Sequence, residues 1–348
     1  MRVIRAAEDD ADRWNEYGDR HRAGCVYHRF EWAGLFHRVY GSTPVYLLAE
    51  RGTEVAGILP MVQLSSPVFG RIYSSMPFFG HGGMLVDDES IAEALAAEAA
   101  RLARRSRAKY IELRHLEEHA LGWHERRDKV NMLLTLPRTA DELFRFQWLE
   151  KKKRDKLKSQ IKRPEKAGHT VRDGRHELLH PFWLVYSENM RDLGSPCHSE
   201  RLFGAILDVF GPRTRVVVVY DGDRPIGGGI VVGGHGTLEI PCASTLRDAN
   251  QSSPNMMLYA RILRYACDEG YERFNFGRSS VPSSTFDFKK QWGAEPHPIT
   301  YHVWVPPGAP PPNLKPDNPK LKAAVEAWKK LPVPVARLLG PPLVKGIP

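Results

Sequence analysis

The sequence predicts an α/β protein with mixed sheets, made of two domains that repeat one order of elements. Two observations carry this prediction. The succession hairpin, strand, loop, helix and strand is found twice along the chain. A length of 348 residues is also enough for two domains that each bury a core of their own. Two copies with a long period do not make a solenoid.

The first copy opens with a predicted hairpin. Apolar residues alternate over 46–50 and 55–62, on either side of a turn at 51–53. After a further strand and a loop rich in Gly, Ser and Pro, the spacing of Leu and Ala predicts a helix over about 91–105. A strand over 110–114 closes this copy.

The second copy repeats the pattern. Its hairpin is predicted over 216–220 and 226–232, and its helix over about 255–268. Ser253 is a plausible N-cap, and Pro254 suits the first helical position. The helix has apolar residues at the i, i+3, i+4 and i+7 positions Tyr259, Ile262, Leu263 and Ala266.

This order of elements is that of the centre of a GNAT acyltransferase domain, so the repeat predicts two GNAT-like domains in tandem. We expect an N-terminal domain over 1–138 and a basic connecting helix within 139–170. A C-terminal domain over 171–305 carries the candidate catalytic motif, and 306–348 form a Pro-rich linker with an amphipathic tail.

The connecting helix, about 141–166, is strongly basic. Pro164 should bend or end it early, and Gly168 should stop it. Its basic face could meet an aminoacyl-tRNA acceptor stem, an anionic lipid head group or only solvent. The tail is predicted to be an extended spacer over 306–312, followed by a helix over about 320–330. This tail either packs back on the protein or docks reversibly on an anionic membrane.

Composition and charge limit the kinds of partner and the cellular compartment that we expect. The formal net charge of +9 and a pI near 9.3 favour anionic partners: nucleic acid, phosphorylated sugar carriers or an anionic membrane surface. Residues 1–14 do not form a signal peptide, and no apolar run approaches the ~18 residues of a membrane span. We therefore expect a cytoplasmic protein, with peripheral contact at the inner membrane left open.

Metal and thiol chemistry are disfavoured. The four cysteines are widely spaced and form no C-x-x-C pair, which excludes a recognisable zinc or redox motif. Cys197 precedes His198, but adjacent residues rarely point at each other, so we interpret this cysteine as structural. His81 and His198 are interpreted as loop or packing residues rather than as catalytic bases.

The most informative stretch is 274–293. A short alternating strand ends at Gly277, which precedes Arg278 and Ser279. After a Ser/Thr-rich loop, the chain reads Phe288-Lys289-Lys290-Gln291-Trp292-Gly293. A cation held between aromatic residues at the end of a strand suits a developing negative charge. The simpler interpretation is an edge strand with a solvated pair of lysines.

This stretch resembles the FemAB family of peptidyl and aminoacyl transferases. The resemblance lies in a strand followed by Gly-Arg-Ser, a polar loop, the motif Phe-Lys-x-x-Trp-Gly and a closing strand over 299–305. The branch found in exopolysaccharide and exosortase gene clusters is the most similar. Further segments that carry the resemblance are 160–168, 189–196, 318–320 and 328–332. The resemblance implies a tandem GNAT fold, and it implies that Lys289 stabilises the oxyanion of acyl transfer.

The candidate substrate-binding residues follow from the motif and from charge. Arg278, Arg191 and Tyr186 are candidates for gripping a phosphate or carboxylate of the acceptor, because an Arg side chain offers a planar fork of donors. Arg191 could equally be a surface residue at a helix end. The full candidate set for substrate binding is Phe288, Arg278, Ser279, Arg191, Tyr186 and Tyr259.

Coenzyme A is disfavoured as a cofactor. GNAT enzymes cradle its pyrophosphate with a Gly-rich loop at the start of the central helix. Neither 79–83 nor 244–250 has that spacing, and the acidic residues 87–89 would repel a phosphate. We expect no tightly bound cofactor, and an acyl donor that is either an aminoacyl-tRNA or an acyl thioester.

The sequence thus predicts an N-acyl or aminoacyl transferase that forms an amide on a cell-envelope precursor, either peptidoglycan or exopolysaccharide. The acceptor is expected to be anionic, carried by a lipid or a nucleotide. Two alternatives stay open. One is a small-molecule N-acyltransferase that uses acyl-CoA or an acyl carrier. The other is a non-catalytic GNAT relic that binds an anionic polymer or a membrane.

Overall fold

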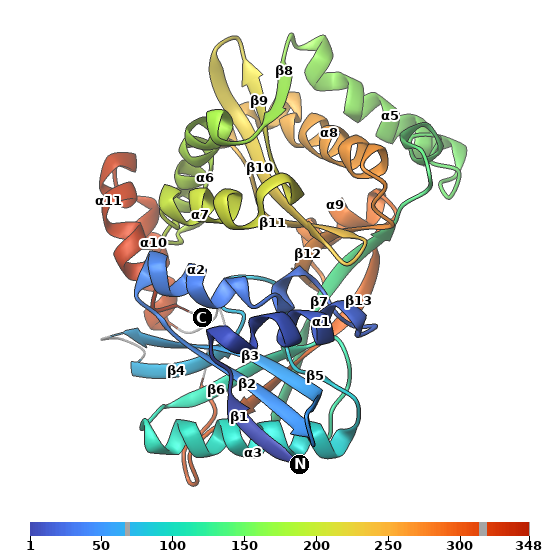
Figure 1. The fold of residues 1–348 in the computed structure, drawn as a ribbon. Coiled ribbons are helices and arrows are strands. Elements are labelled where there is room, and N and C mark those ends of the chain that lie inside the picture. The colour runs from blue at the N-terminus through green and yellow to red at the C-terminus, as the bar shows by residue number, and fades with distance from the viewer. Residues whose placement is uncertain (67–69, 313–318, 348) are drawn as a thin grey trace. The chain divides into compact units, whose positions relative to one another are not determined.

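The computed structural model describes residues 1–66, 70–312 and 319–347, with residues 319–321 described by their backbone (Figure 1). By their internal contacts these residues group into two compact units. The first comprises Met1–Asn131, His297–Lys315 and Lys345–Pro348, and the second comprises Met132–Pro296 and Pro316–Val344. Both combine helices with a mixed sheet, so the predicted α/β class is confirmed.

The first unit has the strand order β1-β2-β3-β4-β6-β13. Neighbours are antiparallel except for β4 and β6, which are parallel. Its elements are β1 (Arg2–Arg5), α1 (Ala11–Arg20), α2 (Glu31–Tyr40), β2 (Thr43–Arg51), β3 (Glu54–Ser66), β4 (Gly70–Ser75), β5 (Leu85–Val86), α3 (Glu89–Arg105), β6 (Tyr110–His115) and β13 (Glu295–Trp304). Strand β7 (His124–Thr135) runs through the division between the units.

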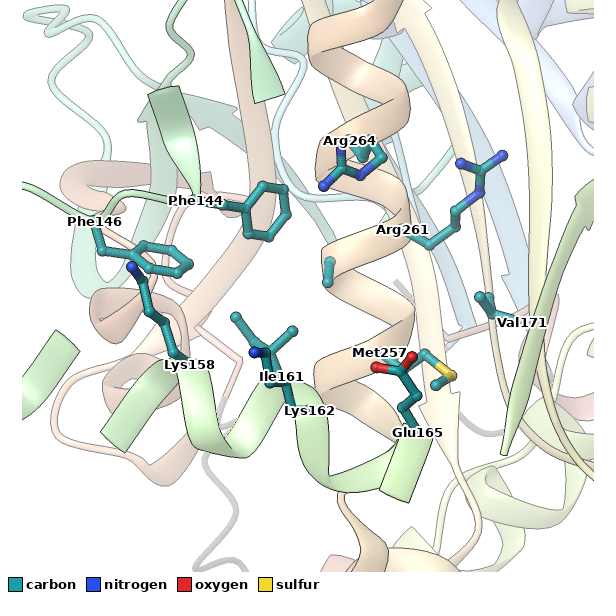
Figure 2. A pocket seen from close by; sticks show the side chains of 11 residues that line it. Phe144, Phe146, Lys158, Ile161, Lys162, Glu165, Val171, Met257, Arg261 and Arg264 are labelled. Carbon is teal, nitrogen blue, oxygen red and sulfur yellow. The ribbon is translucent and has the colours of Figure 1, made fainter. Parts of the chain in front are cut away.

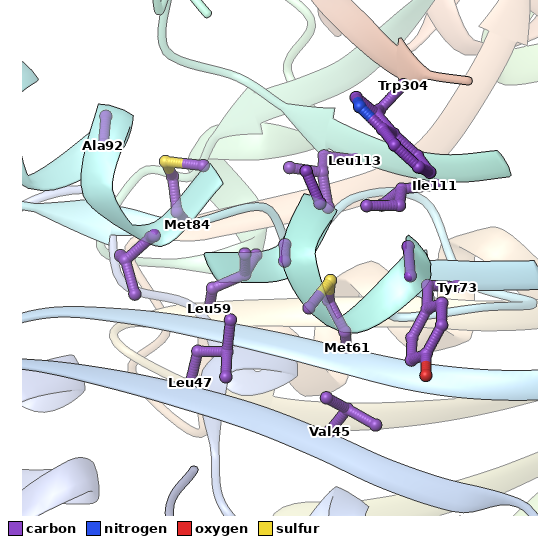
Figure 3. Packing of buried hydrophobic residues seen from close by; sticks show 14 of the residues in the cluster. Val45, Leu47, Leu59, Met61, Tyr73, Met84, Ala92, Ile111, Leu113 and Trp304 are labelled. Atoms are coloured by element: carbon purple, nitrogen blue, oxygen red, sulfur yellow. The ribbon is translucent and has the colours of Figure 1, made fainter. Parts of the chain in front are cut away.

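Alternation along β2 and β3 gives the first unit its layers. Leu47 and Leu59 pack with α3 in one core, shown in Figure 3, whereas Leu48 and Ile58 belong to a second core with α1. Because successive side chains of a strand point to opposite faces, the two cores lie on opposite faces of this sheet. The predicted hairpin and the predicted helix over 91–105 are therefore confirmed.

The second unit has the strand order β12-β11-β10-β9-β8, in which β11 and β12 are parallel and the other neighbours are antiparallel. Its elements are α4 (Ala140–Leu143), α5 (Lys151–Lys166), β8 (Thr170–Gly174), α6 (Leu179–Leu193), α7 (Glu200–Phe210), β9 (Thr214–Asp221), β10 (Arg224–Gly234), β11 (Thr237–Thr245), α8 (Pro254–Asp268), β12 (Arg273–Ser280), α9 (Ser284–Gln291), α10 (Pro319–Lys329) and α11 (Val333–Val344).

Three glycines in β10 let helices approach both faces of this sheet. A Cβ on Gly228 would lie 3.1 Å from Phe182 of α6, whereas one on Gly229 would lie 3.5 Å from Ile262 of α8. Adjacent residues point to opposite faces, so α6 and α8 sandwich the sheet (Figure 1). Pro254 starts α8 as predicted. Ser253 is at the N-cap position with a left-handed φ of 59°, but its side chain makes no capping hydrogen bond.

The predicted single helix over 141–166 is wrong in its first half. The chain instead forms α4 and then α5, with Phe146 between them at a φ of 52°. Phe146 is buried against Trp292, and this packing overrides local helix propensity. Pro164 does not end α5, which continues to Lys166. Gly168, with a φ of 82°, then stops it as predicted.

The C-terminal tail packs on helix α6. Arg191 donates from Nη1 to the carbonyl of Leu331 at 3.0 Å, and Arg337 donates to Ser187 and Leu184 of α6. The expected helix near 320–330 is confirmed as α10. Helix α11 was not predicted from the sequence. The predicted spacer over 306–312 opens with a turn, in which Ala309 donates to the carbonyl of Pro306.

The predicted domain limits differ from the observed division. Strand β13, expected to close the C-terminal domain, groups largely with the first unit, and most of the tail groups with the second. Asn318, one of the residues on which the FemAB resemblance rests, lies outside the described residues. Within the described part of the chain, no helix is long and apolar enough to cross a membrane.

Candidate active site in the second unit

A separation of two parallel strands creates the candidate site. Strands β11 and β12 pair over only three residue pairs, which end at Glu239 and Asn275. Strand β11 nevertheless continues to Thr245, and β12 to Ser280. Beyond Asn275, the N–H and C=O groups of β12 that face β11 have no partner in that strand, so they need other hydrogen-bond partners. The predicted motif Gly277-Arg278-Ser279 lies in this stretch.

Gly277 turns two successive carbonyls toward one side chain. Its φ of 73° lies in the left-handed region, which glycine adopts without strain, and its N–H donates to the side chain of Asn275 at 2.8 Å. In a regular strand, consecutive carbonyls point in opposite directions. Here the carbonyls of Gly277 and Arg278 both accept hydrogen bonds from Nζ of Lys289, at 3.0 and 2.8 Å.

Lys289 comes from α9, a helix that the sequence did not predict. The side chain of Ser283 caps the helix by accepting from the N–H of Phe286 at 3.1 Å. Lys289 lies in the last turn and is only 8% exposed, whereas Lys290 is exposed. The alternative of an edge strand with a solvated pair of lysines is therefore wrong.

Burial and a neighbouring cation change the ionisation of Lys289. Loss of solvation, followed by the charge of Arg278, lowers the pKa of Lys289 to about 8. Because this pKa lies above 7, the ammonium form still predominates at neutral pH, and it donates to the two carbonyls. A partly desolvated cation of this kind acts strongly on a nearby negative charge, because little water screens it.

Aromatic rings surround the base of α9. Tyr259 of α8 stacks on Phe276 with ring centroids 5.4 Å apart, and the edge of Phe288 meets Tyr259 at 5.1 Å. Tyr259 is 9% exposed, and burial raises the pKa of its hydroxyl. Two predicted site residues, Phe288 and Tyr259, are thus in contact, and Phe288 adjoins Lys289 in the chain.

Ser279 contributes a hydroxyl group without a partner. The residue is 4% exposed, and within the described residues its Oγ makes no hydrogen bond. Leaving a buried hydroxyl unpaired costs free energy, so such a group calls for an explanation. Its place in β12, directly after the carbonyl of Arg278 that binds Lys289, makes substrate binding a suitable explanation.

Glu239 is a buried acid that sequence reasoning missed. It is 2% exposed at the last paired position of β11, and loss of solvation raises its pKa to about 8 despite a hydrogen bond with Asn275. The carboxyl group is therefore mostly neutral at pH 7 and braces the strand pair where it separates. A charged residue in an otherwise apolar strand, Leu238-Glu239-Ile240, was the available signal.

Arg191 and Tyr186, both predicted to bind the acceptor, lie on α6 with other partners. Arg191 holds the tail through Leu331 and pairs with Asp192 at 2.7 Å. Tyr186 is 3% exposed, and its hydroxyl accepts from the backbone of His198. These contacts are structural, and a role of either residue in acceptor binding stays a prediction.

The basic helix α5 lines a pocket of about 510 Å³ against α8 (Figure 2). Lys158 and Lys162 project from one face of α5, and Arg264 projects from α8 over the ring of Phe144 at 5.2 Å. The remaining lining residues are Phe146, Ile161, Glu165, Val171, Met257, Ala260 and Arg261. The pocket joins apolar and aromatic walls to cations, which suits an anionic ligand that also carries a flat apolar part.

Aromatic contacts connect this pocket to the Lys289 helix. Phe146 lines the pocket and meets Trp292 with centroids 6.1 Å apart, and Trp292 meets Phe288 at 6.5 Å. Trp148 packs on Gly293, yet 46% of it is exposed. An exposed aromatic residue just before the basic helix α5 in the chain thus packs on Gly293, just after the candidate catalytic helix α9.

The starts of the two central helices do not favour a pyrophosphate. Pro254 occupies the first position of α8, so one of the N–H groups that would face a phosphate is missing. The first turn of α3 is capped by the side chain of Asp88, which accepts from the N–H of Ile91. Which acyl donor the protein uses stays a prediction.

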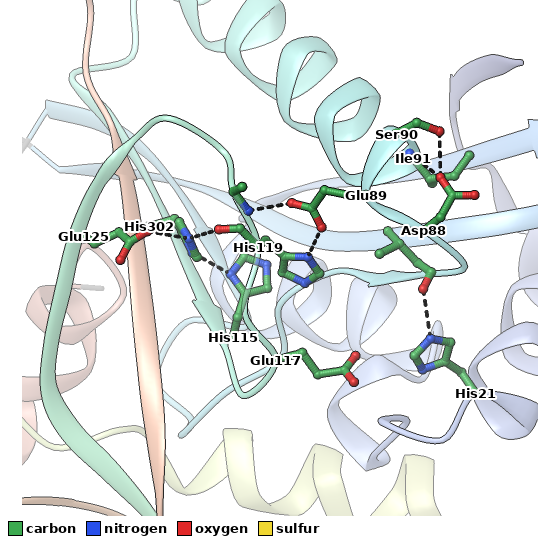
Figure 4. Close-up of polar contacts among 12 residues, drawn as sticks. His21, Asp88, Glu89, Ser90, Ile91, His115, Glu117, His119, Glu125 and His302 are labelled. Atoms are coloured by element: carbon green, nitrogen blue, oxygen red, sulfur yellow. Dashed lines mark hydrogen bonds and ion pairs between the residues drawn. The ribbon is translucent and has the colours of Figure 1, made fainter.

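A histidine cluster lies in the first unit (Figure 4). Nδ1 of His115 and Nδ1 of His302 are 3.0 Å apart, and His119 approaches Glu89 at 3.3 Å. Burial, together with the neighbouring histidines, holds the pKa of His115 well below its usual range. Among the described residues, no group of His, Cys, Asp and Glu has an arrangement that could hold a metal ion.

The other reactive side chains considered above are buried. Burial lowers the pKa of His81 to about 4 and that of His198 to about 3, so both rings are neutral. Cys197 is 1% exposed, and burial raises the pKa of its thiol. These environments agree with packing roles.

Known proteins share this architecture. Residues 151–290 match the family model described as an acetyltransferase (GNAT) domain. Among curated proteins there is no significant match. The crystal structure of FemX is 14% identical in sequence, with a TM-score of 0.65 over 87% of this chain and 98% of its own. The chain has a tandem GNAT fold.

Two further solved structures agree with this assignment. A tandem GNAT protein from the clavulanic acid biosynthesis pathway is 13% identical, with a TM-score of 0.56 over 89% of this chain and 99% of its own. L-PGS from Bacillus licheniformis is 11% identical, with a TM-score of 0.55 over 98% of each chain. At such identities the likeness shows the fold alone, and at that level the predicted resemblance to the FemAB family is confirmed.

Proposed function

We propose that this protein is an acyltransferase that forms an amide bond on a cell-envelope precursor, with its active site in the second unit at Lys289. The observation that carries the proposal is the buried lysine at the separation of β11 and β12, pinned by two backbone carbonyls and with a lowered pKa. Its neighbour Ser279 adds an unpartnered buried hydroxyl. Perturbed ionisable groups of this kind gather at active sites.

The geometry suits stabilisation of an oxyanion. An ammonium group has three N–H bonds, and two of those of Lys289 donate to Gly277 and Arg278. The third can donate to the acyl oxygen when the acceptor amine attacks the carbonyl carbon. The new C–N bond forms, the bond to the leaving group breaks, and the amine proton departs with the leaving group or to solvent. One such donor lowers the barrier by ~3–4 kcal/mol.

Holding donor and acceptor together supplies the rest of the rate, so no protein nucleophile is needed. Ser279 is suited to hydrogen-bond one of the bound substrates. Tyr259 and Phe288 form an apolar wall that keeps water from the reacting carbonyl. The proposed role of Arg278 is to add positive charge near an anionic acceptor, because its charge already acts on Lys289.

For the donor, we favour an aminoacyl-tRNA over an acyl thioester. The pocket between α5 and α8 offers cations and aromatic rings, the combination that binds single-stranded nucleic acid. The starts of α3 and α8 each offer one amide fewer to a pyrophosphate, because Asp88 caps α3 and Pro254 begins α8. For the acceptor, the similarity to FemX, to L-PGS and to a solved domain of a putative lysylphosphatidylglycerol synthetase from Agrobacterium fabrum supports an envelope molecule, either a peptidoglycan or an exopolysaccharide precursor.

One experiment tests the donor and the activity together. The protein is incubated with an amine-bearing envelope precursor and, in parallel, with charged tRNA or acyl-CoA, and amide formation is followed by mass spectrometry. We expect product with charged tRNA that is lost with Lys289→Met. Product with acyl-CoA alone would favour a small-molecule N-acyltransferase. No product with either donor, together with envelope-polymer binding that Lys289→Ala leaves unchanged, would favour a non-catalytic relic.

A further inference from the structure

Helix α11 turns its large apolar side chains outward. Leu338 is 75% exposed, Leu343 49%, Leu339 43% and Val335 38%. These positions follow the i, i+3, i+4, i+8 spacing that places residues on one face of a helix. Among the exposed large hydrophobic residues of the described chain, this is the group that shares one helix face.

The opposite face of α11 holds the helix firmly on the second unit. Ala336, Gly340 and Val344 are buried, and a Cβ on Gly340 would lie 2.8 Å from Sγ of Cys197. Arg337 donates to Ser187 and Leu184 of α6 and lies over the ring of Trp183. Small residues thus fill the intramolecular contact, and the leucines are left for another partner.

The chain that carries this face is basic, although Lys329 pairs with Glu326 at 2.7 Å. Residues 327–348 contain four basic residues, Lys329, Lys330, Arg337 and Lys345, and no acidic residue. Lys330 and Lys345, which flank α11 in the chain, are exposed. An apolar face flanked by cations matches the interface of an anionic bilayer, in which leucines enter the acyl boundary and lysines meet the head groups.

We propose that the outward face of α11, formed by Val335, Leu338, Leu339 and Leu343, docks the protein on an anionic lipid surface. With 12 residues the helix is about 18 Å long, so it lies in the interface and does not span the bilayer. Four side chains fall well short of the roughly 20–30 residues that each partner contributes to a stable protein interface. A lipid surface is therefore a better match than a second copy of the chain.

The proposal is tested with full-length protein, because removal of the tail would uncover α6. Wild-type protein is co-sedimented with vesicles of phosphatidylglycerol and phosphatidylcholine, and with phosphatidylcholine alone, at low and high salt. We expect wild type to pellet with the anionic vesicles at low salt. Leu338→Gln/Leu339→Gln should lower its partition coefficient at least tenfold, since both leucines lose their burial in the interface. Lys330→Gln/Lys345→Gln should lower it about fivefold for each charge.

Leu116→Gln is the matched control, because Leu116 is 40% exposed in the first unit, and it should change the partition less than twofold. Lys289→Met should pellet like wild type, which separates this surface from the proposed chemistry. Thermal unfolding and circular dichroism verify that each variant is folded. The proposal is overturned if wild type stays in solution with anionic vesicles, or if Leu338→Gln/Leu339→Gln pellets equally. A wild-type dimer that this double variant converts to a monomer, with pelleting unchanged, would assign the face to a second copy.

Discussion

Both units contain a pair of parallel strands that separates after three residue pairs, and they differ in what fills the separation. In the first unit, β4 and β6 pair up to Ser74 and Glu112, and the buried ion pair of Glu112 with Arg114 follows. In the second unit, β11 and β12 pair up to Glu239 and Asn275, and a lysine from an added helix follows.

The first unit fills its separation with its own chain. Arg114 is 1% exposed, pairs with Glu112 at 2.8 Å and donates to the carbonyl of Phe79 at 2.9 Å. Gly83 packs on the ring of His115, with no room for a Cβ. The second unit instead brings Lys289 to its separation and depresses the pKa of this lysine. The same architecture is thus used once for stability and once for a candidate active site.

The largest effect is expected from breaking the ion pair of the first unit. Glu112→Leu leaves the guanidinium of Arg114 buried without its carboxylate, which should lower the free energy of unfolding by about 3–5 kcal/mol. Urea denaturation measures this loss. The double variant Glu112→Leu/Arg114→Met removes both charges and should recover most of the stability. A single-variant loss below about 1 kcal/mol would contradict a stabilising role for the pair.

The corresponding change in the second unit should act on rate. Lys289→Met removes the donor to the oxyanion and should lower turnover by roughly ten- to a thousandfold, with little change in acceptor affinity. Steady-state kinetics with the donor identified above measures both quantities. Lys289→Arg keeps the positive charge and should retain part of the activity. If acceptor affinity collapses while the saturated rate survives, Lys289 binds the acceptor instead.

The ionisation of Lys289 predicts how turnover depends on pH. Because its pKa is lowered to about 8 and the charged form is the donor, turnover should fall as the pH rises through about 8. A pH-rate profile between 6 and 10 measures this limb. In Lys289→Arg the limb should disappear, since arginine stays charged throughout. A rate that increases through pH 8 would instead assign Lys289 as a general base.

The two units offer a matched pair of buried hydroxyl groups. Ser279 and Ser74 both lie at or near the end of parallel pairing, and the Oγ of each lacks a hydrogen-bond partner within the described residues. Ser279→Ala should lower kcat/KM about threefold to tenfold, the value of one hydrogen bond to substrate. Ser74→Ala should leave it unchanged. Equal effects of both substitutions would remove the functional distinction between the units.

A further prediction concerns the buried acid of the second unit. In the folded state the pKa of Glu239 is raised to about 8 from an ordinary value of 4.5, so only the unfolded state ionises between these values. Stability is therefore lost as the pH rises through this window. Glu239→Gln does not titrate, and its melting temperature should exceed that of wild type by a few degrees at pH 9 but not at pH 5. Calorimetry at both pH values tests this.

Much of the candidate site could be predicted from the sequence, but its form could not. The Phe-Lys-x-x-Trp-Gly motif indicated Lys289, Phe288 and the strand that ends near Arg278. Lys289 is buried and Lys290 is exposed because both lie in helix α9. In a strand the two lysines would also point to opposite faces, but the strand would not by itself fix either side chain. Glu239 was not identified as a site residue from the sequence, because its unusual property is its burial and not its residue type. Arg191 was a candidate for binding the acceptor, and its hydrogen bond to Leu331, 140 residues away in the chain, could not be predicted from the sequence.

The sequence by itself determined the repeated order of elements, because alternation of apolar residues in strands and their 3.6-residue spacing in helices are local consequences of burial. It also determined the Gly277 turn and the end of α5 at Gly168, where backbone conformation requires glycine. Only the tertiary structure decided which copy holds a candidate active site, and that the leucines of α11 face outward. Both depend on contacts between segments far apart in the chain, which set desolvation and hydrogen bonding and leave no periodic signal in the sequence.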